Sequence, residues 1–386
     1  MSGSRRDGFA LSDRVTSVAP SGIRRLFQLG KSMDDPIDLS MGQPDFDPPE
    51  DVRRAAVDAI ESGRNRYTVT QGIEPLREAL RERYAHRCTG LATGEEDVMV
   101  TSGASGAIVI AYLALLDPGD EVLIPDPYFV VYRNVASLVG ATPVMYDTYP
   151  DFRIDPDKVR AGITDRTRAI VVNSPTNPTG HALDEREARE LAAIADETQI
   201  PLISDEIYED FVYEGRHVSP REYTHNCLVI AGASKSLGMP GLRVGWMIGP
   251  TRFVERCHAV QQYTFVCAPA PGQWAALAGS RVDPGPYRAA YTKKRDLIVN
   301  GLDESYRVVK PRGAFFAFPQ IPQGIEPQRF LDACIEQQLL IVPGSAFSTR
   351  ATHFRLSFAA ADAKLLQAVE VLNSIAADQV RDPRSG

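Results

Sequence analysis

Short apolar runs alternate with amphipathic segments through the middle of the chain. Seven of these runs predict buried strands, at residues 98–101, 121–125, 143–146, 168–173, 201–204, 228–231 and 244–249. Residues 107–116 predict a buried helix, and Asp184 with Glu187 forms a capping pair for a helix that ends near residue 198. Strands that alternate with helices over this length predict a largely parallel sheet covered on both faces.

The flanking segments predict further helices and a second set of strands. Residues 50–63 and 73–84 repeat apolar positions at helical spacing, and residues 14–30 predict one more helix. Residues 287–302 predict a long helix near the C-terminus. Short apolar runs predict the strands of a small α+β domain, at residues 37–40, 306–309, 314–318, 339–342 and 354–358.

The composition is that of a globular protein. At 386 residues the chain is long enough for two domains. Its net charge of -8 argues against nucleic-acid binding, which needs a basic face. The five cysteines form no C-x-x-C pair, so they predict reduced thiols in a cytoplasmic protein, with neither a disulfide frame nor a metal site. The N-terminus lacks the apolar stretch of a signal peptide, and the longest apolar run is too short to span a membrane.

Lys235 is the first candidate for chemistry. It lies between the last two predicted strands, and small residues flank it in the stretch GASKS. A free lysine has a pKa of about 10.4, so its amine is a good nucleophile only when burial or a carbonyl partner removes its proton. The position suits Schiff-base chemistry, although a solvated loop lysine fits this stretch equally well.

Other polar segments follow predicted strands. Residues 102–106 (SGASG) place small residues before a helix, where backbone N–H groups can receive a phosphate; a tight turn is the alternative. Asn177 lies in the proline-rich loop NSPTNPTG, and Asp205 ends a strand with Tyr208 about one helical turn further on. A turn asparagine and a helix N-cap are the alternative roles. Ligands of parallel sheets bind beyond the carboxyl ends of the strands, so these segments are expected to share one ligand.

The order of these motifs points to a family. Gly-Ala-Ser, Asn-Pro-Thr-Gly, Asp-Glu-Ile-Tyr, Ser-Lys and an arginine eight residues beyond the lysine resemble the class I/II aminotransferases, which are fold-type I pyridoxal-phosphate enzymes. The chain looks most similar to the subgroup of archaeal and bacterial aspartate, aromatic and alanine aminotransferases. The resemblance runs from about residue 40 to about residue 360.

This resemblance implies an α/β fold. A large domain would hold a mostly parallel seven-stranded sheet between helices, and a small α+β domain would be discontinuous in sequence. The expected boundaries are an N-terminal arm at residues 1–13, a small domain at 14–45 plus 281–386, and a large domain at 46–280. The family pattern also implies a homodimer with shared active sites.

The resemblance also assigns catalytic roles. Lys235 would hold pyridoxal 5'-phosphate as a Schiff base and then move a proton between the substrate Cα and the cofactor. Asp205 would pair with the pyridine nitrogen and keep it protonated. Tyr208 and Asn177 would hydrogen-bond the phenolic oxygen of the ring.

The remaining implied contacts surround the cofactor. The phosphate ligands would be Gly103, Ala104, Ser105, Ser234 and Arg243. Phe129 matches the aromatic residue that stacks on the ring, with Tyr128 as its alternative, and Tyr67 matches a tyrosine that reaches the phosphate of the neighbouring subunit. Arg355 would clamp the substrate α-carboxylate with its planar, bidentate guanidinium, with Gly42 and Asn177 beside it.

Two departures from the family pattern concern specificity and phosphate binding. Ser105 stands where one aspartate-using branch has a lysine that reads the distal carboxylate, so a strict aspartate preference is in doubt. The candidates for a substitute cation are Arg24, Arg25 and Arg312. Gly232 stands where a hydroxyl residue often contacts the phosphate.

The implied activity is a ping-pong exchange of an amino group between an L-amino acid and a 2-oxo acid. The alternative is another pyridoxal-phosphate reaction on the same fold: β-elimination, decarboxylation, racemisation or oxidation in a biosynthetic pathway. A non-catalytic binding or regulatory role is a further alternative. The intact set of site residues argues against it.

Overall fold

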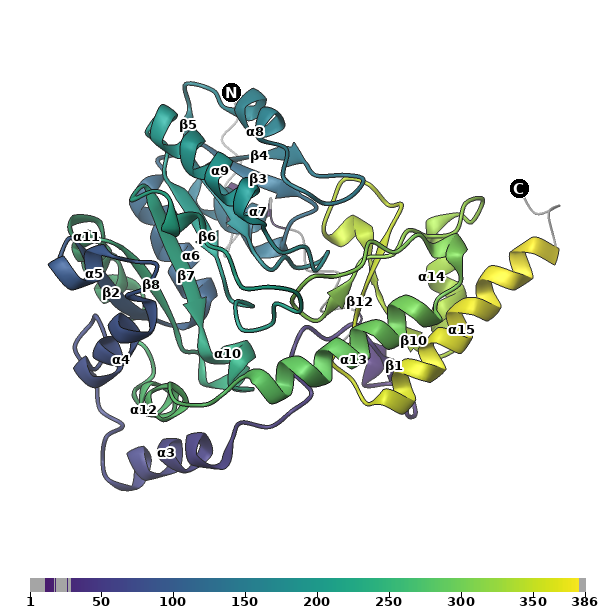
Figure 1. Ribbon diagram of the computed structural model, residues 1–386, viewed down its shortest axis with the longest axis horizontal. Coiled ribbons are helices and arrows are strands. Elements are labelled where there is room, and N and C mark those ends of the chain that lie inside the picture. Colours follow the sequence, from purple (N-terminus) through teal and green to yellow (C-terminus); the bar gives the residue numbers. More distant parts are fainter. Residues whose placement is uncertain (1–10, 17, 19–25, 27–28, 382–386) are drawn as a thin grey trace, which may run out of the picture.

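The computed structural model describes residues 11–16, 18, 26 and 29–381 (Figure 1). Most of the expected N-terminal arm lies outside these residues. So does much of the helix predicted at 14–30, of which the described part includes the short α1 (Asp13–Thr16).

A seven-stranded sheet forms the centre of the molecule, in the order β2-β8-β7-β6-β5-β3-β4. Its strands are β2 (Glu96–Thr101), β3 (Glu121–Asp126), β4 (Thr142–Asp147), β5 (Thr167–Asn173), β6 (Leu202–Asp205), β7 (Cys227–Gly232) and β8 (Gly245–Pro250). Strand β8 is antiparallel to both of its neighbours, and the other neighbouring strands pair in parallel. The predicted α/β fold with a mostly parallel sheet is therefore confirmed.

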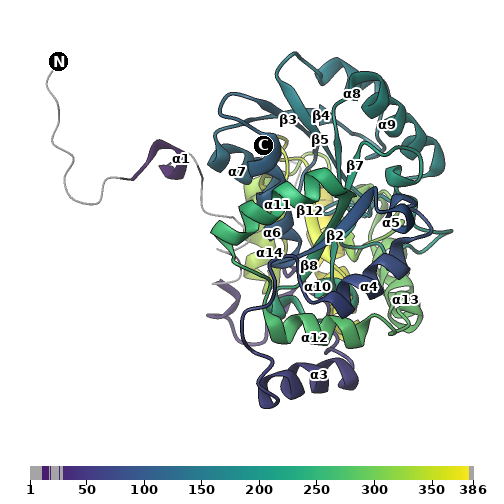
Figure 2. The ribbon, with the colours of Figure 1, turned by 90° about the vertical axis from the view of Figure 1, so that its left-hand side faces the viewer.

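Helices cover both faces of this sheet. Successive strand residues point to opposite faces, so Leu228 and Ile230 of β7 pack in a different core cluster from Val229 and Ala231. One face packs against α6 (Gly103–Leu115), α7 (Val130–Val139) and α11 (Thr251–Thr264). The other packs against α4 (Glu74–Tyr84), α8 (Pro156–Gly162), α9 (Glu185–Thr198) and α12 (Ala270–Gly279). Helix α3 (Glu50–Glu61) packs against α12 on the outside (Figure 2).

The predicted capping pair is present at the start of α9. The Asp184 side chain accepts a hydrogen bond from the Glu187 backbone, and the Glu187 side chain accepts one from the Asp184 backbone.

The rest of the chain forms two small sheets and three long helices. Strand β1 (Ile37–Asp38) pairs with β10 (Leu339–Leu340), and β12 (Phe354–Ser357) lies between β11 (Val342–Pro343) and β9 (Phe316–Ala317). Helix α13 (Gly285–Gly301) runs from the large sheet towards α14 (Pro327–Glu336) and α15 (Asp362–Arg381) (Figure 1). Among the described residues, no helix is both long and apolar enough to cross a membrane.

The strand predicted at residues 306–309 is wrong. Residues Glu304–Tyr306 form a 3-10 turn, capped by the Asp303 side chain, which accepts a hydrogen bond from the Ser305 N–H at 2.9 Å. Arg307 then takes a left-handed backbone conformation with φ 42°, which ends any extended run. The aspartate cap, rather than the apolar residues after it, decides the local structure here.

We propose that the two units divide as the sequence suggests, into a small domain of residues 14–45 plus 281–386 and a large domain of residues 46–280. One core cluster supports this division, because it joins Ile37 and Leu39 to Phe330, Leu356 and other C-terminal residues. Tyr208 and Phe211 belong to the same cluster, so the boundary is packed rather than open.

A pair of glycines brings three elements into backbone contact. Gly232 and Gly245 are partners in the register of β7 and β8. A Cβ at Gly245 would lie 2.5 Å from the Ala104 nitrogen, and one at Gly232 would lie 2.9 Å from the Gly245 Cα. This contact explains the absent hydroxyl at Gly232, because a side chain there would push β8 away from the first turn of α6.

We expect Gly245→Ala to destabilise the protein by about 1–3 kcal/mol, since the new methyl group meets backbone atoms that cannot rotate away. Gly241→Ala is the matched control, because a Cβ there would meet nothing within 4 Å. Thermal unfolding of both variants measures the difference. Equal melting temperatures would contradict the contact.

Candidate active site

A cavity of about 210 Å³ opens at the carboxyl ends of the parallel strands. Of the residues expected at the site, it brings together Gly42, Ala104, Ser105, Phe129, Asn177, Asp205, Tyr208, Ser234, Lys235, Arg243 and Arg355. The lining also includes residues that the sequence did not single out: Ile108, Tyr132, Asn173, Ile207 and Pro240.

Lys235 projects into this cavity from α10 (Ala233–Ser236), a single turn that follows β7. Its Nζ donates a hydrogen bond to the Gly42 carbonyl oxygen at 2.5 Å. Burial lowers the pKa of Lys235 to about 8, and the nearby positive charges of Arg355 and Arg243 act in the same direction. A substantial fraction of this amine is therefore neutral, and so nucleophilic, in mildly alkaline solution.

Asp205 ends β6 and is almost fully buried, with 3% of its surface exposed. One carboxylate oxygen, Oδ2, accepts a hydrogen bond from the Tyr132 hydroxyl at 2.7 Å, and Oδ1 accepts one from the Ile207 N–H at 3.2 Å. Burial raises the pKa of Asp205 to about 6, although these hydrogen bonds oppose the shift. Both hydrogen-bond donors are neutral, so the site holds a buried carboxylate that no cation of the described residues contacts directly.

Two asparagines link the strand ends. The Asn173 side chain donates to the Asp205 carbonyl oxygen at 2.9 Å and accepts from the Asn177 N–H at 2.9 Å. This bridge fixes the start of the proline-rich loop relative to β6.

Tyr208 is also buried and packs edge-on against the rings of Phe315 and Phe316.

Arg355 extends from β12 and is 1% exposed. Its Nη1 donates to the Asn177 Oδ1 at 3.0 Å and its Nη2 donates to the Ser40 carbonyl oxygen at 2.6 Å, while its Nε has no partner. The guanidinium lies over the Phe316 ring, 4.5 Å from its centroid. Burial lowers the pKa of Arg355 to about 10, so the group stays charged at neutral pH. A buried cation that lines the cavity is a candidate site for an anion.

A second group of anion-binding features lies at the first turn of α6. Gly103 has φ +72°, and a Cβ there would lie 2.6 Å from the Arg243 Nη2. The Arg243 side chain is exposed, and its Nη1 donates to the Pro240 carbonyl oxygen at 3.0 Å. Ala104, Ser105 and Ser234 line the same end of the cavity. A helix N-terminus beside an arginine favours a bound phosphate.

The structure distinguishes the two aromatic candidates for stacking on the cofactor ring. Phe129, at the N-cap of α7, lines the cavity, whereas Tyr128 is buried and its hydroxyl accepts a hydrogen bond from Arg133. Tyr67 is 85% exposed and does not line the cavity within one chain. Arg312 does not line it either, and Arg24 and Arg25 lie outside the described residues.

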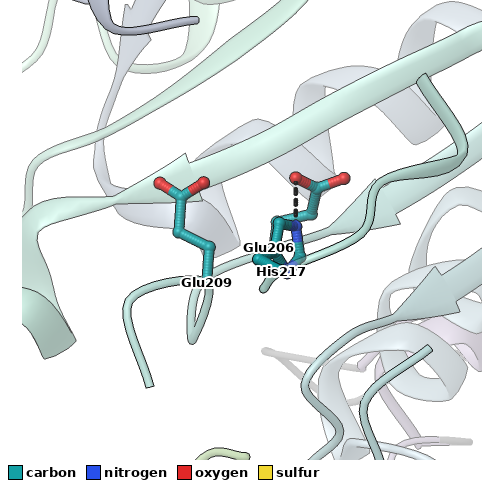
Figure 3. A group of neighbouring side chains, drawn as sticks. All are labelled: Glu206, Glu209 and His217. Atoms are coloured by element: carbon teal, nitrogen blue, oxygen red, sulfur yellow. Dashed lines mark hydrogen bonds and ion pairs between the residues drawn. The ribbon is translucent and has the colours of Figure 1, made fainter. Parts of the chain in front are cut away.

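Glu206, Glu209 and His217 lie close together next to the turn that carries Asp205, and one possible ligand atom of each lies within 4.8 Å of the other two (Figure 3). This is the spacing of a metal-ligand set. However, the Arg87 Nη2 is 3.3 Å from the Glu206 Oε2 and also pairs with the Glu209 Oε2. The Arg87 guanidinium thus already pairs with both carboxylates, and we interpret the cluster as a buried ion-pair network.

This network holds the turn that carries Asp205 and Tyr208. Glu209 accepts hydrogen bonds from the Tyr84 hydroxyl and from Arg83, whose Nη2 lies 3.0 Å away. Although burial opposes its charge, Arg87 and Arg83 lower the pKa of Glu209 to about 2. The C-terminal end of α4 and Arg87 just beyond it therefore hold Glu206, Glu209 and Asp210 through contacts outside the cavity.

Comparison with known proteins identifies the family to which this fold and this cavity belong. The family model for aminotransferase class I and II matches residues 34–372. A probable aspartate aminotransferase of Methanocaldococcus jannaschii is 35% identical over 378 residues, which cover 95% of this chain and 99% of that protein. An aspartate/prephenate aminotransferase of Thermus thermophilus is 36% identical, over 93% of this chain and 97% of its own length.

Solved structures agree with this match. The aspartate aminotransferase of Thermus thermophilus with maleate superposes with a TM-score of 0.89 at 35% identity, over 95% of this chain and 99% of that one. The chain belongs to the class I and II aminotransferase family. It is therefore a transaminase of a family whose members depend on pyridoxal phosphate, and the alternative reactions on this fold are not supported.

We expect Glu209→Ala to destabilise the protein by about 3 kcal/mol, because it removes the carboxylate that the buried Arg87 shares with the half-buried Arg83. Arg87 then pairs with Glu206, and Arg83 pairs with Asp210. Glu185→Ala is the control. It breaks an exposed ion pair with Arg189 on α9 and should change stability little. Denaturant unfolding of both variants measures the difference, and similar midpoints would show that the network does not hold the turn.

Proposed function

We propose that pyridoxal 5'-phosphate binds in this cavity, and that an L-amino acid and a 2-oxo acid exchange an amino group there in two successive half-reactions. The buried Asp205 carboxylate carries this proposal, because its hydrogen-bond donors are neutral and it shares the cavity with Lys235. A cationic ring nitrogen placed against Asp205 would supply the missing counter-charge.

The residues present fit the cofactor at three points. Gly103 leaves room for an anion between α6 and Arg243, where a side chain would collide with the guanidinium. Phe129 offers an aromatic ring on the cavity wall, and Asp205 offers a buried carboxylate. Tyr208 and Asn177 offer polar groups for the ring oxygen. When bound, the cofactor supplies an aldehyde that condenses with amines and a ring that accepts the electrons of a broken Cα–H bond.

The chain's own groups then have separate tasks. Lys235 binds the aldehyde, and after its release its amine holds the proton that leaves the substrate Cα, with the Gly42 carbonyl within hydrogen-bond reach. Arg355 would receive the substrate α-carboxylate on its planar guanidinium, and Asn177 and the Ser40 carbonyl keep the plane of that group fixed. Closure of the small domain over the substrate would exclude water.

A cytoplasmic homodimer with shared active sites completes the proposal. Tyr67 is a large aromatic side chain that is 85% exposed in one chain, as expected if it completes the phosphate site of a second copy. The donor class is open to aspartate, aromatic and neutral amino acids. Relatives of this chain are named for aspartate, for prephenate and for aromatic amino acids.

The decisive experiment mixes the purified, cofactor-loaded protein with single amino acids and follows the change in cofactor absorbance together with 2-oxo acid release. We expect conversion with at least one L-amino acid. Lys235→Ala should still bind the cofactor without a covalent bond but react at least about 10²-fold more slowly, because it lacks the proton-transfer amine. A near-normal rate in this variant would refute the role of Lys235.

The lowered pKa of Lys235 predicts a pH dependence. Only the neutral amine attacks the aldehyde, so the rate of covalent attachment to the cofactor-free protein should rise with pH and reach half its maximum near pH 8. Stopped-flow absorbance from about pH 6 to about pH 12 measures this rate, a range that includes the ordinary pKa of a free lysine amine. Nα-acetyl-lysine is the control, with a midpoint near its ordinary pKa of about 10.4. A midpoint that matches the free amine would contradict burial of Lys235.

A further inference from the structure

Tyr132 lines the active-site cavity but belongs to none of the sequence motifs. It lies in the first turn of α7, and only 1% of its surface is exposed. Its hydroxyl donates to the Asp205 Oδ2 at 2.7 Å, the only side-chain hydrogen bond to that carboxylate among the described residues. The other hydrogen bond, from the Ile207 N–H, is longer at 3.2 Å.

Tyr132 also supports the opposite wall of the cavity. Its ring packs edge-on against Phe129, with centroids 5.8 Å apart and planes at 81°. Phe129 caps α7 and Tyr132 follows three residues later, so one helical turn carries both side chains. The position of α7 therefore sets the distance between the aromatic wall and the carboxylate.

We propose that Tyr132 is a positioning residue, which orients the Asp205 carboxylate towards the ring nitrogen of bound pyridoxal phosphate and keeps it at a fixed distance from Phe129. The inference rests on the proposed cofactor role of Asp205. It adds a residue that acts on the cofactor only through its neighbours.

The alternative is that Tyr132 simply fills the core, and a second tyrosine offers the comparison. Tyr112 is 0% exposed, belongs to the same core cluster and has a hydroxyl with no hydrogen-bond partner. Replacing either tyrosine by phenylalanine removes one oxygen atom from this cluster. Only the change at Tyr132 removes a hydrogen bond from Asp205.

The test measures the dissociation constant of pyridoxamine 5'-phosphate by fluorescence titration of the cofactor-free, full-length protein. This probe binds without a covalent bond to Lys235, so it reports the non-covalent contacts of the ring and the phosphate. We expect Tyr132→Phe to weaken binding by about tenfold, the effect of losing a hydrogen bond to a charged group. Tyr112→Phe should bind like the unchanged protein.

A double-mutant cycle separates positioning from packing. If Tyr132 acts through Asp205, Tyr132→Phe should have no further effect in an Asp205→Asn background. An equal tenfold loss in that background would overturn the proposal, as would unchanged affinity in the single variant. Failure of the unchanged protein to bind the probe would instead refute the proposed cofactor site, and the role of Tyr132 with it.

Discussion

Two groups of opposite charge share one buried cavity without forming an ion pair. Asp205 and Lys235 both line the cavity, yet no ion pair within 4.0 Å joins them. Burial disfavours both charged forms, so the pKa of the carboxylate rises and that of the amine falls. A ligand with a cationic nitrogen and an aldehyde relieves both costs at once. The arrangement therefore favours a ligand that carries both groups.

The surrounding structure holds these two groups apart. Asp205 ends β6 and Lys235 follows the neighbouring strand β7, so their separation is set by the sheet. Behind the sheet edge, Arg87 and Arg83 hold the turn that begins at Asp205. A buried ion-pair network adds little net stability. In this protein we infer that it selects a single conformation of the turn, because each charged side chain has few other partners. Its place behind the turn rather than in the cavity fits this role.

The sequence predicts the large sheet and most of the cavity, and the reason is physical. Buried parallel strands are short apolar runs, and the polar residues after them must meet at one edge. Asn177, Asp205 and Lys235, which lie at or just after strand ends, can therefore be identified from the sequence alone. The small domain is less predictable, since its strands are as short as two residues and pair with distant segments, such as β1 with β10. The positions of these short strands depend on tertiary packing, which the local pattern of apolar residues does not show.

Tyr132 shows why part of the site escapes sequence reasoning. It lies 73 residues from Asp205 in the sequence, within an amphipathic helix. Nothing in the apolar pattern of that helix distinguishes a tyrosine that bonds to Asp205 from one that only fills the core. The specificity for the amino donor also depends on residues that the sequence motifs do not reveal. Among the described lining residues, the basic side chains are Lys235, Arg243 and Arg355, and each already has a proposed task in the common chemistry. A strict preference for a dicarboxylic donor would need a further cation, supplied by a segment outside the described residues or by a second subunit. The chemistry thus follows from residues at the strand ends, whereas the choice of donor depends on what closes over them.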